Sequence, residues 1–82
     1  MSEEQSFLEQ LPQAAVEVRD GKITALNSAA LSHLPELAVG AQPPQYLSAP
    51  LDGVQTAGAF TGGGGLFVFS KVSSPGGVLL LF

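Results

Sequence analysis

The C-terminal third of the chain decides the fold, through Leu66-Phe67-Val68-Phe69-Ser70-Lys71-Val72-Ser73, the turn Ser74-Pro75-Gly76-Gly77 and the apolar run Val78 to Phe82. Upstream, Gly58-Ala59-Phe60-Thr61 leads into four consecutive glycines at 62–65. Aromatic and β-branched residues between glycine-rich turns predict three neighbouring antiparallel strands. Regular hairpins would pair Phe60 with Phe67 and Phe69 with Phe82.

Both faces of this predicted meander are largely apolar. One face carries Phe60, Phe67, Phe69, Lys71, Leu80 and Phe82, and the other carries Leu66, Val68, Ser70, Val72, Leu79 and Leu81. An antiparallel sheet with one solvated face alternates more cleanly between apolar and polar residues. We therefore expect cover on both sides, from the chain's own middle helices on one and from the N-terminal helix or a second chain on the other. The sequence leaves open which face is outward.

A second β signal surrounds Asp20-Gly21, which lies between the alternating runs 14–19 and 22–26. Asp-Gly suits a two-residue type I′ turn, because both central positions need a positive φ. The turn predicts a register with three pairs: Arg19 opposite Lys22, Val18 opposite Ile23, and Val16 opposite Ala25. Val16, Val18, Ile23 and Ala25 would then share one face.

Helices are predicted before and after this hairpin. Ser2 and Gln5 resemble a capping box, which predicts an N-terminal helix over 2–11 that ends at Pro12. Asn27 is the expected N-cap of a helix of about two turns. Prolines and glycines make 35–58 irregular, with short helical turns expected near Pro35–Ala38 and Pro44–Leu47. The expected fold is a single α+β domain: an N-terminal helix, then a core over 12–82 with a five-stranded antiparallel sheet and short helices on one face.

Composition narrows the classes of function. Of the 82 residues, 45% are hydrophobic and 12% are charged, which is about half the usual charged fraction of roughly 25%. Some apolar surface must therefore be exposed or covered by a partner, and this favours an oligomer or a domain of a larger protein. The three cations Arg19, Lys22 and Lys71 are too scattered for a nucleic-acid partner. The run 78–82 is too short to span a bilayer, so we expect no membrane contact by this segment.

No motif announces catalysis, a metal or a cofactor. The chain has no cysteine, and Pro35 interrupts the only metal-like spacing, His33-x-x-Glu36, so His33 is expected to be a half-exposed surface residue. Gly62–Gly65 lacks the Gly-Lys-Ser/Thr of a phosphate loop and precedes a strand, so a hairpin loop is expected. We find no acid–base pair, and expect a non-enzymatic domain with no catalytic residues, no metal and no cofactor.

Several short motifs occur in a familiar order. Leu11-Pro12 precedes the first strand, Asp20-Gly21-Lys22-Ile23 has the form D-G-x-I, and Asn27 with Ala29-Ala30 has the form N-x-A-A. Gly40 and Tyr46-Leu47 follow. Over residues 11–82 the chain resembles the PAS domains of signalling sensors. The resemblance implies a cytoplasmic sensory module of a signal-transduction protein, such as a two-component sensor histidine kinase, with a C-terminal effector domain after Phe82.

Two hypotheses of function, from different classes, are left open by the sequence. In the first, the chain is a PAS-like sensory and dimerisation module, and Tyr46, Ser70 and Asn27 are candidate polar groups in a small-molecule pocket between sheet and helices. The alternative is a protein-interaction domain with a packed core and no ligand, in which Ser70 bonds to backbone and Tyr46 closes the edge of the core. A homodimer is expected, with candidate contacts at Phe7, Leu8, Leu11, Phe67, Phe69, Leu80 and Phe82.

Overall fold

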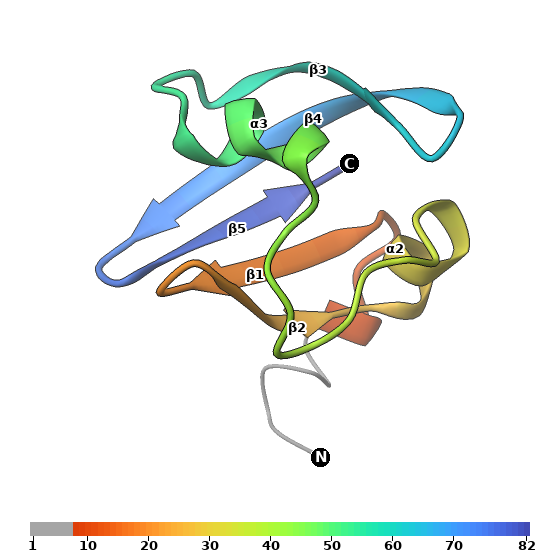
Figure 1. The fold of residues 1–82 in the computed structure, drawn as a ribbon, viewed down its shortest axis with the longest axis horizontal. Helices are drawn as coiled ribbons and strands as arrows, with labels where there is room; N and C mark the ends of the chain where they lie inside the picture. The colour runs from red at the N-terminus through yellow and green to blue at the C-terminus, as the bar shows by residue number, and fades with distance from the viewer. Residues whose placement is uncertain (1–7) are drawn as a thin grey trace.

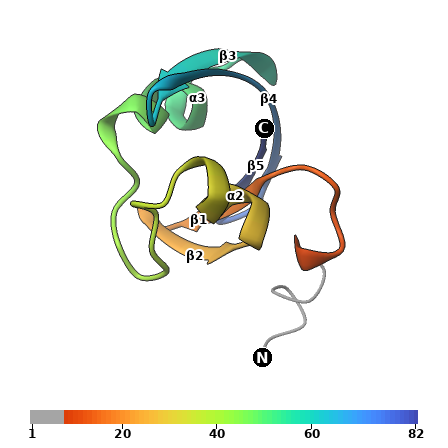
Figure 2. The ribbon, with the colours of Figure 1, turned by 90° about the vertical axis from the view of Figure 1, so that its right-hand side faces the viewer.

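The computed structural model describes residues 8–82 and forms one curved antiparallel sheet around short helices (Figures 1 and 2). The strands lie in the order β2-β1-β5-β4-β3. The elements follow one another as β1 (Ala15–Arg19), β2 (Lys22–Leu26), α2 (Ser28–His33), the 3-10 turn η1 (Gln45–Leu47), α3 (Ser48–Asp52), β3 (Ala57–Gly62), β4 (Gly65–Ser74) and β5 (Gly77–Leu81). The α+β class and the five-stranded antiparallel sheet are thus confirmed. No helix within 8–82 is long and apolar enough to cross a membrane.

The first hairpin turns as predicted but contains a bulge. Asp20 and Gly21 have φ values of 53° and 74°, as a type I′ turn requires. The pairs next to the turn are confirmed, but the register shifts between Glu17 and Val18.

The shift corrects the predicted pairing of Val16 with Ala25. Val16 lies opposite Leu26, and Glu17 lies opposite Ala25. The extra residue on β2 reverses the alternation of side chains, because these have a period of two along a strand. Leu26 therefore joins Val16 in the main core, whereas Ala25 packs with Ala15 on the other face of the sheet.

The C-terminal meander has the predicted strands. Phe60 pairs with Phe67, as predicted. Ser70 pairs with Leu81, which is the predicted register of β4 and β5, because the next pair along the ladder would be Phe69 with Phe82. The glycine run forms a two-residue turn at Gly63 and Gly64, whose φ values are 58° and 85°. Pairing of β1 with β5 joins the meander to the first hairpin.

The helical elements are short and lie inside the curve of the sheet (Figure 2). Asn27 caps α2, as predicted. Pro44 precedes η1, and Pro50 lies in α3. Most of the predicted N-terminal helix, with its capping box and Phe7, lies outside the described residues. Leu8 and Glu9 are helical, and the N–H of Leu11 donates to the carbonyl of Leu8 at 3.2 Å.

Burial distinguishes the two faces of the sheet. The inner face, toward the helices, holds the main core, which includes Val16, Ile23, Leu34, Leu47, Phe60, Phe69 and Leu80. On the outer face, Leu8, Ala15 and Ala25 form a small second cluster, with Leu11, Leu79 and Leu81 packed against it. Within the described residues, Leu8 and Leu11 thus cover the part of the outer face that β1, β2 and β5 form.

Candidate functional site

Aromatic rings fill the space between sheet and helices where a ligand pocket was expected. The ring centroid of Phe60 lies 5.4 Å from that of Phe67 and 5.4 Å from that of Phe82. Phe60 also stacks on Tyr46, with ring centroids 6.2 Å apart. Ring pairs at these spacings contribute about 0.5–1.5 kcal/mol each beyond the burial of their area. This part of the core is packed by the protein's own side chains.

Tyr46 closes the edge of this aromatic group. Its ring is half-buried, and its hydroxyl donates to the carboxylate of Glu36. Burial raises the pKa of Tyr46, and the hydrogen bond to Glu36 and the negative charge of Glu36 raise it further. The hydroxyl is thus engaged with an exposed carboxylate of the same chain.

This environment predicts a loss of stability at high pH. The folded protein keeps the Tyr46 proton above about pH 10, where an unfolded tyrosine releases it. The unfolded state then binds fewer protons, so the free energy of unfolding falls as the pH rises above this value. Tyr46→Phe should remove this part of the decline, which urea unfolding at a series of pH values would measure. Because Tyr46 is the only tyrosine, its phenolate absorbance reports its titration directly, and a midpoint near pH 10 in the folded protein would contradict the prediction.

Ser70 does not share a site with Tyr46. It lies on β4 between Phe69 and Lys71, whose side chains are buried on the inner face. Because side chains alternate along a strand, Ser70 faces outward and is exposed. The structure therefore separates these two pocket candidates onto opposite faces of the sheet.

Asn27 is buried, but each of its hydrogen-bonding positions is used within the protein. Its Oδ1 accepts from the N–H of Ala15 and from the N–H of Ala30, both at 3.0 Å. Its Nδ2 donates to the carbonyls of Leu8 and Gln13, both at 2.9 Å. A side-chain amide has two donors and one acceptor oxygen with two lone pairs, so no capacity remains for a ligand. Asn27 instead joins the N-terminal segment, β1 and α2.

Lys71 occupies the inner position of β4 among the aromatic residues. Its side chain is only 7% exposed. Its Nζ donates to the carbonyl of Gly53 and, at 3.4 Å, to that of Leu51, while its backbone N–H donates to Thr56 at 2.7 Å. Carbonyl oxygens compensate a buried ammonium for its lost hydration. Lys71 thus holds the segment after α3 against the sheet. The alternation of β4 correctly predicts that Lys71 shares a face with Phe67 and Phe69. Its hydrogen bonds to the end of α3 could not be predicted, because they depend on where α3 packs.

The candidate dimer contacts need a correction, because most of them are used within the protomer. Phe69 is 5% exposed and Leu80 is 0% exposed, and Phe67 and Phe82 pack against the same core. The helices cover this face, so Phe69 and Leu80 are not available to a partner, and Phe67 and Phe82 are half-buried. Leu8 is likewise buried in the outer cluster, with Leu11 packed beside it, and Phe7 lies outside the described residues.

An exposed apolar surface lies instead on the outer side of β3 and β4. Leu66, Val68 and Val72 are 70%, 75% and 55% exposed. We call this surface the outer patch and define it by the outward residues of the two strands, which carry no charge: Ala57, Ala59, Thr61, Leu66, Val68, Ser70 and Val72. Contiguous apolar surface of this kind marks sites of association.

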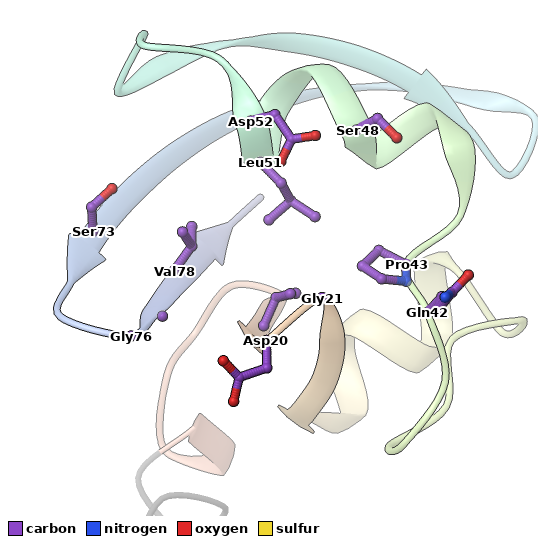
Figure 3. A pocket seen from close by; sticks show the side chains of 12 residues that line it. Asp20, Gly21, Gln42, Pro43, Ser48, Leu51, Asp52, Ser73, Gly76 and Val78 are labelled. Atoms are coloured by element: carbon purple, nitrogen blue, oxygen red, sulfur yellow. The ribbon is translucent and has the colours of Figure 1, made fainter.

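A cleft of about 570 Å³ opens where the two hairpin turns approach α3 (Figure 3). Its polar lining includes Asp20, Gln42, Ser48, Asp52 and Ser73, and its apolar lining includes Val18, Pro43, Leu51 and Val78. Asp20 and Asp52 offer hydrogen-bond acceptors, whereas Gln42 and the two serines can both donate and accept. Among the described residues, no lysine, arginine or histidine lines the cleft. None of the predicted pocket residues is among them. Sequence reasoning missed this cleft because its walls come from four separate segments that only the closed sheet brings together.

The remaining sites that the sequence suggested agree with simple structural roles. His33 is exposed, with its ring 5.4 Å from that of Phe67 in an edge-on arrangement. Among residues 8–82, no group of three or more potential metal ligands occurs. Gly62–Gly65 forms the tight β3–β4 turn.

The comparisons with known proteins identify no relative. No protein-family model, curated protein or solved structure matches this chain.

Proposed function

We propose that this chain is a PAS-like sensory and dimerisation module of a cytoplasmic signalling protein, acting by binding and relay rather than by catalysis. The observation that carries the proposal is the uncharged outer patch, which lies beside a core that is already packed. The sensor histidine kinase context implied by the sequence resemblance belongs to the same proposal. An effector following Phe82 would receive the signal.

The arrangement of elements supports the PAS-like part of this proposal. The motifs on which the resemblance depends lie at structural positions that need them, since Asp20-Gly21 forms the first turn and Asn27 caps the following helix. The element order is a hairpin, short helices and a three-stranded meander, as in the resemblance.

The outer patch supports association with a second copy. Full burial of a valine or leucine side chain stabilises by about 1.5–3 kcal/mol, and the exposed parts of Leu66, Val68 and Val72 together correspond to about two such side chains. The molecule carries a net charge of −4, yet no charged residue lies in the patch. Two copies could therefore approach there without close repulsion between like charges.

Contacts around Asn27 support a relay between the two faces of the sheet. Asn27 binds the backbone of Leu8, which lies on the outer face, and caps α2 on the inner face. Glu9 accepts hydrogen bonds from the N–H and hydroxyl of Ser28 at 2.8 Å and 2.9 Å. Phe82 exchanges two backbone hydrogen bonds with Ala14, which precedes the Asn27-bound residue Ala15. These contacts could take two arrangements. A partner that binds the two arrangements with different affinities would shift the balance between them, and the shift would pass to the effector proposed after Phe82.

A protein-interaction domain without a ligand is the second candidate. The aromatic rings that fill the inner space favour it, whereas the cleft beside Asp20 and Asp52 leaves room for a small molecule in the sensory version. Both candidates use the outer patch for association.

Sedimentation of the isolated chain tests the common part of both. We expect a dimer at high protein concentration and a monomer for Ala59→Glu, because the new carboxylate would lie within the uncharged surface through which the two copies associate. Val39→Glu is the matched control, since Val39 is 61% exposed in a loop away from the patch, and it should remain dimeric. A wild-type chain that stays monomeric at high concentration contradicts the proposal.

A further inference from the structure

The two edges of the sheet differ in how they end. At the β2 edge, the N–H of Ile23 donates to Ala41 at 2.9 Å, and the N–H of Gly40 donates to Ile23 at 2.7 Å. The loop after α2 therefore closes this edge. The opposite edge is β3, at the far side of the sheet (Figure 1).

Alternating backbone groups of β3 point away from the sheet. The tight turn at Gly63 and Gly64 and the hydrogen bond from Lys71 N–H to Thr56 set the pattern. In an antiparallel ladder every second residue bonds to its neighbour. Gly58, Phe60 and Gly62 thus bond to β4, whereas the N–H and C=O groups of Ala57, Ala59 and Thr61 point outward. No hydrogen bond from within residues 8–82 reaches these outward groups.

The β3 edge also lacks the features that keep edge strands apart. Natural proteins protect such edges with lysine, proline, inward charges or bulges. Ala57–Gly62 reads AGAFTG, with no charge and no proline. Its pairing with β4 is continuous, without a shift in register. The outward side chains of β3 are small, so the strand itself presents no bulky group to a second strand.

We infer that β3 pairs with β3 of a second copy, antiparallel about a two-fold axis at Ala59, so that two sheets become one. Ala59 would lie opposite Ala59 of the partner subunit, and Ala57 opposite Thr61 of the partner subunit. Three such pairs exchange about six backbone hydrogen bonds. The inference rests on the proposed dimerisation and specifies its geometry.

A second copy fits this edge better than an unrelated segment. The two-fold arrangement is self-complementary, because each outward donor meets the same strand's acceptor in the partner. It also joins the two outer patches on one face, since Val68 lies opposite Ala59. Three strand spacings of about 4.8 Å would separate Val68 from its equivalent, about 14 Å in all. No charge on either strand opposes the pairing.

Amide hydrogen exchange of the wild-type chain, followed by NMR, tests the geometry directly. The amides of Ala57, Ala59 and Thr61 should exchange several-fold more slowly as protein concentration rises, because only the partner can protect them. The amides of Gly58 and Phe60 are the internal reference, since β4 protects them at every concentration. Outward amides that exchange at a rate independent of concentration overturn the inference.

Two variants extend the test beyond exchange. Ala59→Pro removes one outward donor but no bond to β4, and should yield a folded monomer. Ala59→Val keeps the N–H and should stay dimeric. Thr61→Lys alters no backbone group and should also give a monomer, which guards against misfolding of the proline variant.

The outcomes distinguish this inference from the proposed function. A dimer that Val68→Glu dissolves but Ala59→Pro and Thr61→Lys do not would refute edge pairing and leave dimerisation through the patch. A monomer at every concentration would refute both. Protection that arises only with an added peptide of unrelated sequence would refute the second copy as the occupant.

Discussion

Asn27→Ala is expected to lower the free energy of unfolding by about 3–5 kcal/mol, which is a large share of the roughly 5–10 kcal/mol that a domain of this size possesses. The substitution leaves the N–H groups of Ala15 and Ala30 without their acceptor, and the carbonyls of Leu8 and Gln13 without their donor. Each buried group that loses its partner costs about 1–3 kcal/mol, although some can be rehydrated after local rearrangement. Urea unfolding followed by far-ultraviolet circular dichroism would measure the change.

Two further variants divide the effect of Asn27 into its parts. Asn27→Asp keeps the oxygen that caps α2 but removes both donors and places a carboxylate beside two carbonyls, so we also expect it to destabilise the fold strongly. Ser28→Ala removes only an exposed hydrogen bond to Glu9 and should cost less than about 1 kcal/mol. If Asn27→Ala costs no more than Ser28→Ala, the hydrogen bonds by which Asn27 links the N-terminal segment, β1 and α2 do not stabilise the fold as proposed.

Gly62→Ala is expected to destabilise the protein by about 1–3 kcal/mol, the usual cost of overpacking a core. A Cβ at Gly62 would lie 2.6 Å from Cε1 and 2.9 Å from Cγ of Tyr46. The ring would have to move away from β3, and its stacking on Phe60 and its hydrogen bond to Glu36 would be disturbed. The midpoint of urea unfolding should fall, and near-ultraviolet circular dichroism should report the altered packing of the single tyrosine.

Gly65→Ala is the matched control, because Gly65 pairs with Gly62 across the same turn. The nearest side-chain atoms to a Cβ there are those of Phe67 at 3.5 Å, an ordinary contact. We expect a neutral effect or a gain of up to about 1 kcal/mol, because alanine restricts the unfolded chain more than glycine does. Equal destabilisation by the two substitutions would show that contact with Tyr46 is not the reason for glycine at 62.

Much of the local structure follows from the order of residues. Asp20-Gly21 can adopt the two positive φ values of a type I′ turn, and Asn27 has the oxygen that a helix N-terminus needs. The alternation in β4 correctly grouped Phe67, Phe69 and Lys71 on one face. Turns, caps and alternation depend on neighbours along the chain, so sequence patterns report them well.

The candidate sites were predicted less well because they depend on contacts between distant segments. Tyr46 and Ser70 are polar residues in apolar surroundings, but the helices cover the phenylalanine face of β4, and Ser70 lies on the other, exposed face. Asn27 satisfied the expectation of a cap, yet its amide group is taken up by Leu8 and Gln13. The dimer candidates were the largest apolar residues, and the core competes for these first because it removes the most area from water.

The sequence by itself determined the strands, the turns, the cap of α2 and the surplus of apolar surface. Only the tertiary structure decided which apolar face is buried, because both faces of the meander have similar hydrophobicity and the choice depends on which side the helices pack. The bulge in the first hairpin was likewise decided by packing, since it places Leu26 in the main core and Ala25 in the outer cluster. The open β3 edge arises in the same way, because the loop after α2 bonds to the β2 edge, whereas no segment within residues 8–82 bonds to the outward backbone groups of β3.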